Sequence, residues 1–180
     1  MKGVVFTEFL EMVEHKFSAE MVDDIIDDAQ LASGGAYTSV GTYPHQEMVA
    51  LVVALSQRTA ISVADLLRAF GEYLFGRFVI VYPSFFVESH DAFAFLAGID
   101  RIIHAEVRKL YPDAELPRFV VEQHEADRLV LLYDSGRHFE DLAEGLMRGC
   151  LNHFGGQINL AREMVGQDGQ RKERFVLTRE

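Results

Sequence analysis

Tyr133-Asp-Ser135-Gly-Arg137 is the most informative stretch of this 180-residue chain. It overlaps the end of the β-rich run 128–134. If the strand continues through the stretch, Tyr133, Ser135 and Arg137 point to one face, because successive side chains of a strand alternate. Two hydroxyl groups and a guanidinium on one face would bind a pair of carboxylates, or a phosphate. A polar strand end that runs into a turn is the alternative interpretation, and the stretch by itself favours this alternative.

Short β-rich runs flank one helix in the last third of the chain. The predicted strands cover 118–123, 128–134, 158–165 and 174–178. They pair as two hairpins, the first around a polar turn and the second over Gly166-Gln-Asp-Gly169. Between the hairpins, a helix over 140–154 ends at Gly155-Gly156. This part of the chain therefore has the predicted order β-β-α-β-β.

The first two thirds show the apolar periodicity of helices. The predicted helices cover about 5–13, 21–29, 44–59, 63–75, 83–96 and 99–111. Pro44 is expected as a first helical residue, and Ser62 with Asp65 has the spacing of an N-terminal cap. Pro112 and Pro117 end the helical region. The chain is therefore predicted to be α+β, with no linker long enough to separate independent domains.

The composition argues against several classes of protein. The chain has 28 acidic and 17 basic side chains and a formal net charge of −11, whereas a nucleic-acid binder needs a basic face. It shows no signal-peptide core, and its longest uncharged apolar run, 48–55, is far too short to span a bilayer. One cysteine, Cys150, excludes a disulfide framework within the chain. We therefore expect a cytoplasmic protein that binds neither nucleic acid nor membrane.

Two groups of reactive or metal-binding residue types have ordinary explanations. The four aspartates within 23–28 form one helix face, and a solvated surface explains them better than a cation site does. Cys150 and His153 share a face of the helix over 140–154, but two ligands do not make a structural zinc site. An enzyme that used this pair would also lack an orienting residue and an oxyanion site. Neither group predicts a function.

His104 lies in the strongly apolar helix predicted over 99–111. A lone helical histidine is more often a packed or surface residue than a ligand, but neutral imidazole is also an axial ligand of haem iron. Haem requires a large apolar slot, one imidazole, and donors or cations for its two propionates. The 14 phenylalanines, His104 and the Tyr133–Arg137 stretch supply all three. Together these residues suggest haem as a cofactor.

The chain resembles the haem nitric oxide/oxygen-binding (H-NOX) domains, which are related to the sensor part of soluble guanylate cyclase. The resemblance runs essentially end to end, and motif order, spacing and length all agree. The stretches that carry it are Met1-Lys-Gly-Val-Val5, Ala69-Phe-Gly-Glu-Tyr-Leu-Phe75, His104 leading into Lys109-Leu-Tyr111, and Tyr133-x-Ser135-x-Arg137. The last of these is the most specific, since it matches the family's propionate-binding motif.

The resemblance implies a single α+β domain over 1–180. A helical N-terminal lobe of about 1–60 would pack on a lobe of about 61–180, which contains the haem-proximal helices and a four-stranded antiparallel sheet. Haem b (iron protoporphyrin IX) would lie between the two lobes. His104 would be the proximal iron ligand, and the motif's tyrosine, serine and arginine would hold the propionates.

The resemblance also assigns further residues around the haem. Pro117, thirteen residues after His104, matches a proline that distorts the porphyrin in relatives. The apolar distal side or pocket wall would be formed by Val5, Phe9, Leu74, Phe78 and Leu142.

Two departures from the family pattern carry information. Oxygen-binding relatives have a distal tyrosine five residues after the motif arginine, where this chain has Leu142. Bound dioxygen is polar and gains from a hydrogen-bond donor, whereas nitric oxide binds ferrous haem tightly without one. We therefore expect nitric oxide and carbon monoxide as ligands and no stable dioxygen complex, although Tyr73 is another tyrosine that could reach the pocket.

Some relatives also bind zinc through a cysteine cluster, which a chain with Cys150 alone should lack.

The function implied by the resemblance is gas sensing rather than catalysis. In the family, nitric oxide weakens or breaks the iron–histidine bond, and freeing His104 would let the N-terminal lobe rotate. With no effector domain in the chain, the expected partner is a histidine kinase or a cyclic-di-GMP enzyme that is regulated in trans. The alternative is a haem-independent ligand-binding or interaction module of the same fold, in which the Tyr-Ser-Arg residues hold another anion.

Overall fold

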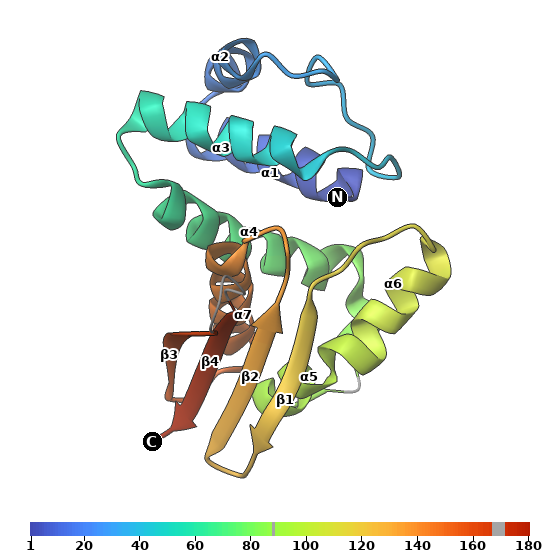
Figure 1. Cartoon of the computed structure of the whole chain (residues 1–180), viewed down its shortest axis with the longest axis vertical. Helices are drawn as coiled ribbons and strands as arrows, with labels where there is room; N and C mark the ends of the chain where they lie inside the picture. Colours follow the sequence, from blue (N-terminus) through green and yellow to red (C-terminus); the bar gives the residue numbers. More distant parts are fainter. Residues whose placement is uncertain (88, 167–171) are drawn as a thin grey trace.

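The computed structural model describes residues 1–87, 89–166 and 172–180. Figure 1 shows three helices grouped at one end of the molecule and a four-stranded sheet at the other. The three helices, here called the helical group, are α1 (Gly3–Lys16), α2 (Ala19–Ala29) and α3 (His45–Thr59). The long helix α4 (Val63–Val81) runs between this group and the sheet. The predicted α+β class, with helices first and an antiparallel sheet last, is confirmed.

The first residues of the chain are fixed to the loop that precedes α3. The ammonium group of Met1 donates to the Tyr43 carbonyl at 2.7 Å, and the Tyr43 N–H donates to the Met1 carbonyl at 2.9 Å. Lys2 forms an isolated antiparallel bridge with Thr42. At Gly3, a Cβ would lie 1.8 Å from a backbone oxygen of the loop, so a side chain does not fit. The N-terminus therefore belongs structurally to the helical group.

The acidic face of α2 is partly engaged rather than simply solvated. Arg58 on α3 pairs with Asp24 and Asp28, its Nε lying 2.6 Å from Oδ2 of Asp28. The hydrogen bond from Arg58 lowers the pKa of Asp28. The other two aspartates of this face are exposed. The predicted solvated face therefore agrees with the structure, since the Asp24 and Asp28 side chains stay 39% and 41% exposed in these pairs; the cation from α3 is the added feature. Pro44 also differs slightly from the prediction: it lies just before α3 as its N-cap.

Helix α4 begins at the predicted cap and ends later than predicted. The Asp65 N–H donates to Oγ of Ser62 at 3.1 Å, which satisfies one of the helix's first N–H groups. The predicted end near residue 75 is wrong, since the helix continues for another turn and a half and packs Phe78 against the core. Pro83 sets the actual end, because a residue that precedes proline is disfavoured in helical conformation; Tyr82 has φ −126°.

The predicted helix over 83–96 is wrong. The structure has a short 3-10 helix, η1 (Pro83–Phe85), and then a separate helix, α5 (Ala92–Gly98). Asp91 starts α5, because its carboxylate accepts the Ala94 N–H at 3.1 Å. The apolar residues on either side of this cap belong to two elements, which periodicity alone did not separate.

Helix α5 continues into one π-helical turn, η2 (Ile99–Ile103), and then into α6 (His104–Leu110). The predicted helix over 99–111 is therefore present, but its first turn is wider than an α-helical turn. Isolated π turns occur frequently at functional sites. His104 directly follows the π turn η2 and is the first residue of α6.

The sheet consists of two hairpins joined through their second strands. Its strands are β1 (Arg118–His124), β2 (Arg128–Asp134), β3 (Ile158–Val165) and β4 (Lys172–Arg179), in the order β1-β2-β4-β3 with all neighbours antiparallel. Both predicted hairpins are present, although residues 167–169 of the second predicted turn lie outside the described residues. Strand β4 begins two residues earlier than expected.

Helix α7 (Glu140–Phe154) lies behind the sheet in Figure 1 and packs against α4. Glycines bring these two helices close together. A Cβ on Gly145 of α7 would lie 2.1 Å from the Arg68 carbonyl oxygen, and one on Gly71 of α4 would lie 2.5 Å from the Leu142 carbonyl oxygen. Backbone therefore contacts backbone where α4 and α7 cross.

Within the described residues, no single helix is long and apolar enough to cross a membrane; α3 and α4 meet that test together, but the pair is bent by 113°.

Candidate functional site

His104 is positioned by a carboxylate from the turn before it. Its Nδ1 lies 2.7 Å from Oδ1 of Asp100, and Oδ2 of Asp100 accepts the N–H of Phe119 at 2.9 Å. Burial lowers the pKa of His104, although Asp100 opposes this effect. The imidazole is therefore neutral at pH 7, with Nδ1–H directed at Asp100 and the lone pair on Nε2. A neutral imidazole with a fixed tautomer is the form that binds a metal.

A row of aromatic rings connects His104 with the motif stretch. The ring centre of Phe119 on β1 lies 6.1 Å from that of His104 and 5.3 Å from that of Tyr133 on β2. Phe119 and Tyr133 are direct partners in the β1–β2 register. The fold therefore brings the predicted ligand and the predicted motif, which are 29 residues apart, to the same region.

The motif residues do not line one strand face, as they would if the strand continued through the stretch. Strand β2 ends at Asp134, and the Arg137 N–H donates to Oγ of Ser135 at 3.3 Å in the turn that follows. The alternative, a polar strand end that runs into a turn, describes the backbone. The three residues nevertheless stay close together, since the buried Tyr133 lies at the end of β2 and Ser135 and Arg137 follow it directly in the turn. Burial raises the pKa of Tyr133, so the phenol stays a hydrogen-bond donor.

Positive groups gather around the motif arginine. Arg137 forms an ion pair with the exposed Glu115, in the segment between α6 and β1. Burial, followed by the charges of Arg137 and of the Met1 ammonium, lowers the pKa of His45 at the start of α3. The ring of His45 contacts Phe139, with ring centres 6.2 Å apart. Cations and donors from both ends of the fold therefore lie near the motif, which suits an anionic ligand.

The five residues predicted for the distal side belong to one apolar cluster. They are Val5 and Phe9 on α1, Leu74 and Phe78 on α4, and Leu142 on α7. Phe9, Leu74 and Leu142 are buried, and the other two are partly buried against them. The structure therefore gathers these residues where α1, α4 and α7 meet.

Tyr73 packs at the edge of the same cluster. Burial raises its pKa, and the charges that act on its hydroxyl come from Glu8, Arg77 and Glu11. The hydroxyl is therefore associated with the charged side of the contact between α1 and α4.

Sequence reasoning missed two residues that position the site, Asp100 and Phe119. The spacing of Asp100 four residues before His104 was an available signal, because side chains at i and i+4 meet on a helix. Phe119 had no comparable signal, since its contact with His104 depends on how β1 packs against η2. Pro117, the predicted haem-distorting residue, is half-buried one residue before β1.

The thiol of Cys150 is buried, and burial raises its pKa. The ring of His153 is packed against Phe75, Phe86 and Phe154. A thiol that stays protonated is a poor nucleophile, so this pair gives no support to a cysteine enzyme. Among the residues that the structure describes, no group of three or more His, Cys, Asp and Glu side chains is placed to hold a metal ion.

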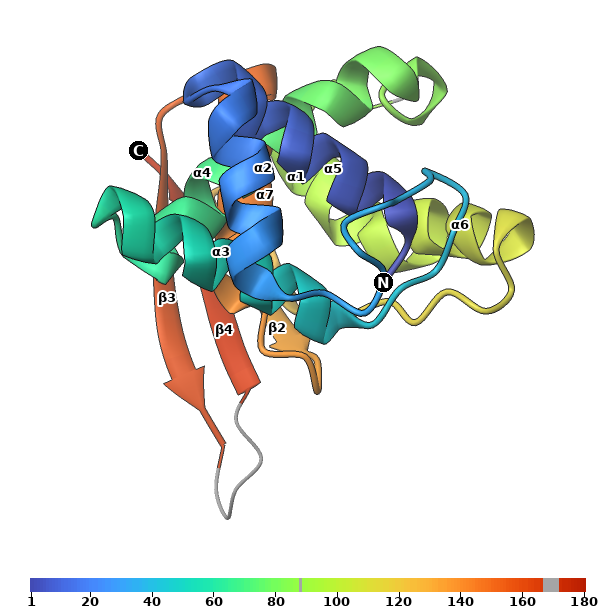
Figure 2. The same ribbon diagram turned by 90° about the horizontal axis from the view of Figure 1, so that it is seen from above.

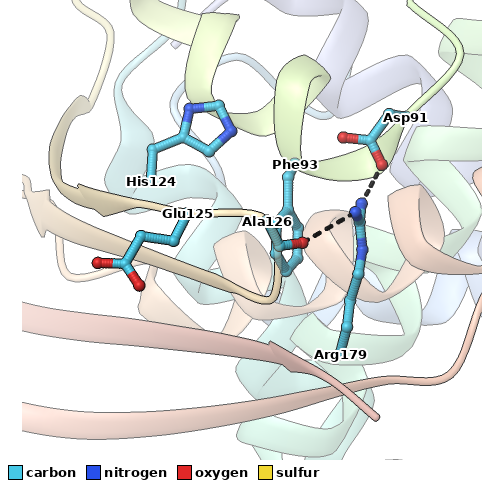
Figure 3. A pocket seen from close by; sticks show the side chains of 6 residues that line it. All are labelled: Asp91, Phe93, His124, Glu125, Ala126 and Arg179. Atoms are coloured by element: carbon cyan, nitrogen blue, oxygen red, sulfur yellow. Dashed lines mark hydrogen bonds and ion pairs between the residues drawn. The ribbon is translucent and has the colours of Figure 1, made fainter.

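A cavity of about 250 Å³ lies at the end of the sheet away from the motif (Figure 3). The guanidinium of Arg179 lies 4.2 Å from the Phe93 ring centre, donates to the Ala126 carbonyl at 3.1 Å and pairs with Asp91. These contacts connect β4 to the β1–β2 turn and to the start of α5. None of the predicted haem residues lines this cavity, so it is separate from the candidate site.

The donor set around His104 and the motif fits haem. His104 offers a neutral imidazole, the end of β2 and the turn after it offer two hydroxyls and a guanidinium, and the α1–α4–α7 cluster supplies apolar side chains. These are the three requirements of a haem with two propionates.

Comparison with known proteins supports the same interpretation. A family model described as haem-NO-binding matches residues 2–162. No curated protein matches the chain. Among solved structures, the ferrous unliganded H-NOX protein from K. algicida is 42% identical, with a TM-score of 0.93 over 100% of this chain and 97% of that one.

Two further structures carry gas ligands. The H-NOX protein from Shewanella woodyi, solved with IWP-051 in the Fe(II)CO state, is 40% identical with a TM-score of 0.85, over 100% of this chain and 95% of that one. The H-NOX protein from S. oneidensis in the Fe(II)NO state is 24% identical with a TM-score of 0.91, over 100% of this chain and 99% of that one, which shows a shared fold.

Proposed function

Because the chain belongs to the haem-NO-binding (H-NOX) family, whose domains sense gases through haem, we propose that it is a cytoplasmic sensor of nitric oxide. The observation that carries the proposal is the setting of His104, a partly buried neutral imidazole whose Nδ1 is held at 2.7 Å by Asp100. Haem held by these residues would supply a ferrous iron that binds diatomic gases.

The residues of the chain divide the task of holding haem. His104 would bind the iron through Nε2, while Asp100 fixes the ring orientation. Tyr133, Ser135 and Arg137 would hold the propionates, as the family motif implies. The single cysteine of the chain excludes the two-thioether attachment of c-type haem, which supports haem b.

Leu142 supports nitric oxide as the ligand. It occupies the position of the distal tyrosine of oxygen-binding relatives, and it lies in an apolar cluster with Phe9 and Leu74. An apolar wall gives a bound dioxygen no hydrogen bond, while nitric oxide and carbon monoxide need none. A similar protein from Shewanella woodyi was solved in the Fe(II)CO state, which supports carbon monoxide as a further ligand.

Signalling would follow from the release of His104. A ligand shifts a conformational equilibrium only through a difference in interaction between two states. Here that difference would be the loss of the His104 tether, which frees α6 to move. We infer that the rearranged surface regulates a separate histidine kinase or cyclic-di-GMP enzyme, as the family resemblance implies.

Absorption spectroscopy tests the proposal directly. Ferrous protein purified from haem-replete cells should show a Soret band that shifts when nitric oxide is added, and no stable oxygen complex in air. A colourless protein would contradict it and would leave the alternative, a haem-independent module of the same fold that binds another anion beside Arg137. The ratio of haem to protein therefore separates the two.

Substitution of the proposed ligand gives the first residue-specific prediction. His104→Gly should lose most of its haem on gel filtration, because no other imidazole is held at this position, and added imidazole should restore the spectrum. His90→Gly is the matched control, since His90 is exposed in the loop before α5. If His104→Gly keeps the wild-type spectrum, another residue is the ligand.

A further inference from the structure

Lys2 is enclosed between the helical group and the segment that follows α6. Its Nζ donates to Oγ1 of Thr42 at 2.8 Å, lies 3.8 Å from Oδ1 of Asp113 and lies 4.3 Å from the Tyr111 ring centre. The Lys2 side chain is only 12% exposed, which is low for a lysine. A lysine ammonium over an aromatic ring is attracted by the ring electrons, in addition to its ion pair.

Asp113 completes the contact from the other side. Its Oδ2 accepts the Thr42 hydroxyl at 2.9 Å, while Oδ1 faces Lys2. The hydrogen bond from Thr42 lowers the pKa of Asp113, so the carboxylate is charged at neutral pH. Both oxygens of Asp113 are thus directed at the helical group.

The two halves of this contact are anchored in different parts of the fold. Lys2 and Thr42 are adjacent in the bridge that fixes the N-terminus to the loop before α3. Tyr111 is the C-cap of α6, and its N–H donates to the Val107 carbonyl at 2.8 Å. It follows His104 by seven residues, which is about 10 Å along a helix. Figure 2 shows the N-terminus beside the loop that follows α6.

We propose that Lys2, Thr42, Tyr111 and Asp113 form a latch between the helical group and the His104 helix, which holds the resting orientation and opens when α6 moves. This inference rests on the proposed function, because it assigns the regulation of the same site. Movement of His104 is transmitted along α6 to Tyr111, where it separates the ring and Asp113 from Lys2. The helical group is then released from its resting orientation.

Distances between spin labels on the two parts measure this release. Labels are placed at Asp23→Cys on α2 and Met164→Cys on β3, two exposed positions. Cys150 is retained, since it is fully buried. Haem-loaded ferrous protein is compared with and without nitric oxide, and its Soret band is recorded on the same samples.

Two variants open the latch without removing a haem contact. Lys2→Met keeps an unbranched side chain of similar length and removes the positive charge, and Asp113→Asn removes the negative charge. In the absence of nitric oxide, a several-fold larger fraction of the molecules of both variants than of the wild type should have the label-to-label distance that nitric oxide produces in the wild type. Lys109→Met is the control, because Lys109 is 69% exposed and pairs with Glu106 within α6 at 2.5 Å.

The outcomes separate the latch from the sensor function. A wild type without a Soret shift overturns the proposed function. If the wild type shows a Soret shift but no change in the distance between the labels, the latch alone is overturned. The latch is also overturned if the distances in Lys2→Met and Asp113→Asn both resemble those in Lys109→Met. The double variant Lys2→Met/Asp113→Asn should match Lys2→Met, because that variant already removes the contact of Lys2 with Asp113; fully additive effects would also overturn the latch.

Discussion

A histidine binds a metal with a defined orientation when its second nitrogen has a fixed partner. Asp100 is this partner for His104, and the N–H of Phe119 in turn fixes the Asp100 carboxylate at 2.9 Å. The residue that orients the imidazole is therefore held by the first strand of the sheet. Any shift between η2 and β1 alters the direction in which Nε2 points.

Asp100→Asn tests this orientation. The amide can occupy the same space, but it lacks the charge that stabilises Nδ1–H, and its single oxygen can replace only one of the two carboxylate acceptors, because the amide nitrogen is a donor. Haem transfer from the variant to apomyoglobin should be faster by roughly 10-fold, the lower end of the usual effect for such partners. Asp127→Asn, an exposed aspartate in the β1–β2 turn, is the control. Equal transfer rates for all three proteins would refute the role of Asp100.

Leu142 gives a prediction about ligand choice. Leu142→Tyr places a hydroxyl in the apolar cluster formed with Phe9 and Leu74, and that donor would stabilise bound dioxygen. The variant should form an oxygen complex in air that is detectable by its Soret band, and the wild type should not. Leu142→Phe provides a ring of similar size without the hydroxyl. An oxygen complex in the Phe variant would show that size, not the hydroxyl, controls the selection.

Helices α4 and α7 form the internal support of the molecule, and their contact depends on backbone proximity. Gly145 faces the Arg68 carbonyl. A Cβ added at Gly149 would lie 2.6 Å from the Cβ of Phe75. Apolar residues of both helices enter the cluster that contains Phe9 and Leu142. The helix spacing therefore also sets the width of the proposed distal side.

Gly145→Ala should force α4 and α7 apart, because the obstructing atom is backbone and cannot rotate away. We expect a loss of about 1–3 kcal/mol in the free energy of unfolding, typical of an overpacked core. Gly76→Ala on α4 is the control, since no neighbouring atom of the described residues lies within 4 Å of its added Cβ, and it should be neutral or stabilising by up to about 1 kcal/mol. Urea denaturation measures both. A Gly145→Ala protein as stable as Gly76→Ala would contradict the close approach.

The whole molecule depends on how the helical group is joined to the rest. Arg77 on α4 donates from Nε to Oε2 of Glu8 on α1 at 2.6 Å, and the Glu8 side chain is buried. This pair joins α1 to α4, whereas Lys2 and Asp113 join the N-terminus to the segment after α6. The helical group is therefore joined to the rest of the fold by ion pairs at two separate places.

Arg77→Met should lower the thermal stability, because it leaves the Glu8 carboxylate buried without its cation. Glu8→Gln/Arg77→Met should recover much of that loss, since no buried charge remains. Arg148→Met is the matched control: Arg148 pairs with Glu144 within α7 and is 45% exposed. Thermal unfolding followed by circular dichroism compares the three variants. If the double variant is no more stable than Arg77→Met, the buried charge of Glu8 does not cause the loss of thermal stability in Arg77→Met.

Local patterns in the sequence predicted most of the elements. Periodicity located the helices and strands, and Ser62 with Asp65 marked the start of α4. Two differences arose where one side chain outweighed periodicity: Asp91 starts a new helix inside an apolar run, and Ser135 accepts a hydrogen bond in the turn after β2.

The sequence by itself determined the residue types of the site, because the family motif and His104 are visible without coordinates. It could not determine which groups act on them. The Asp100–Phe119 contact, the Arg58 pairs on α2 and the enclosure of Lys2 each join residues from different elements. Periodicity and capping depend on neighbours within one or two turns, whereas these contacts depend on how helices and strands pack. Only the tertiary structure could decide them.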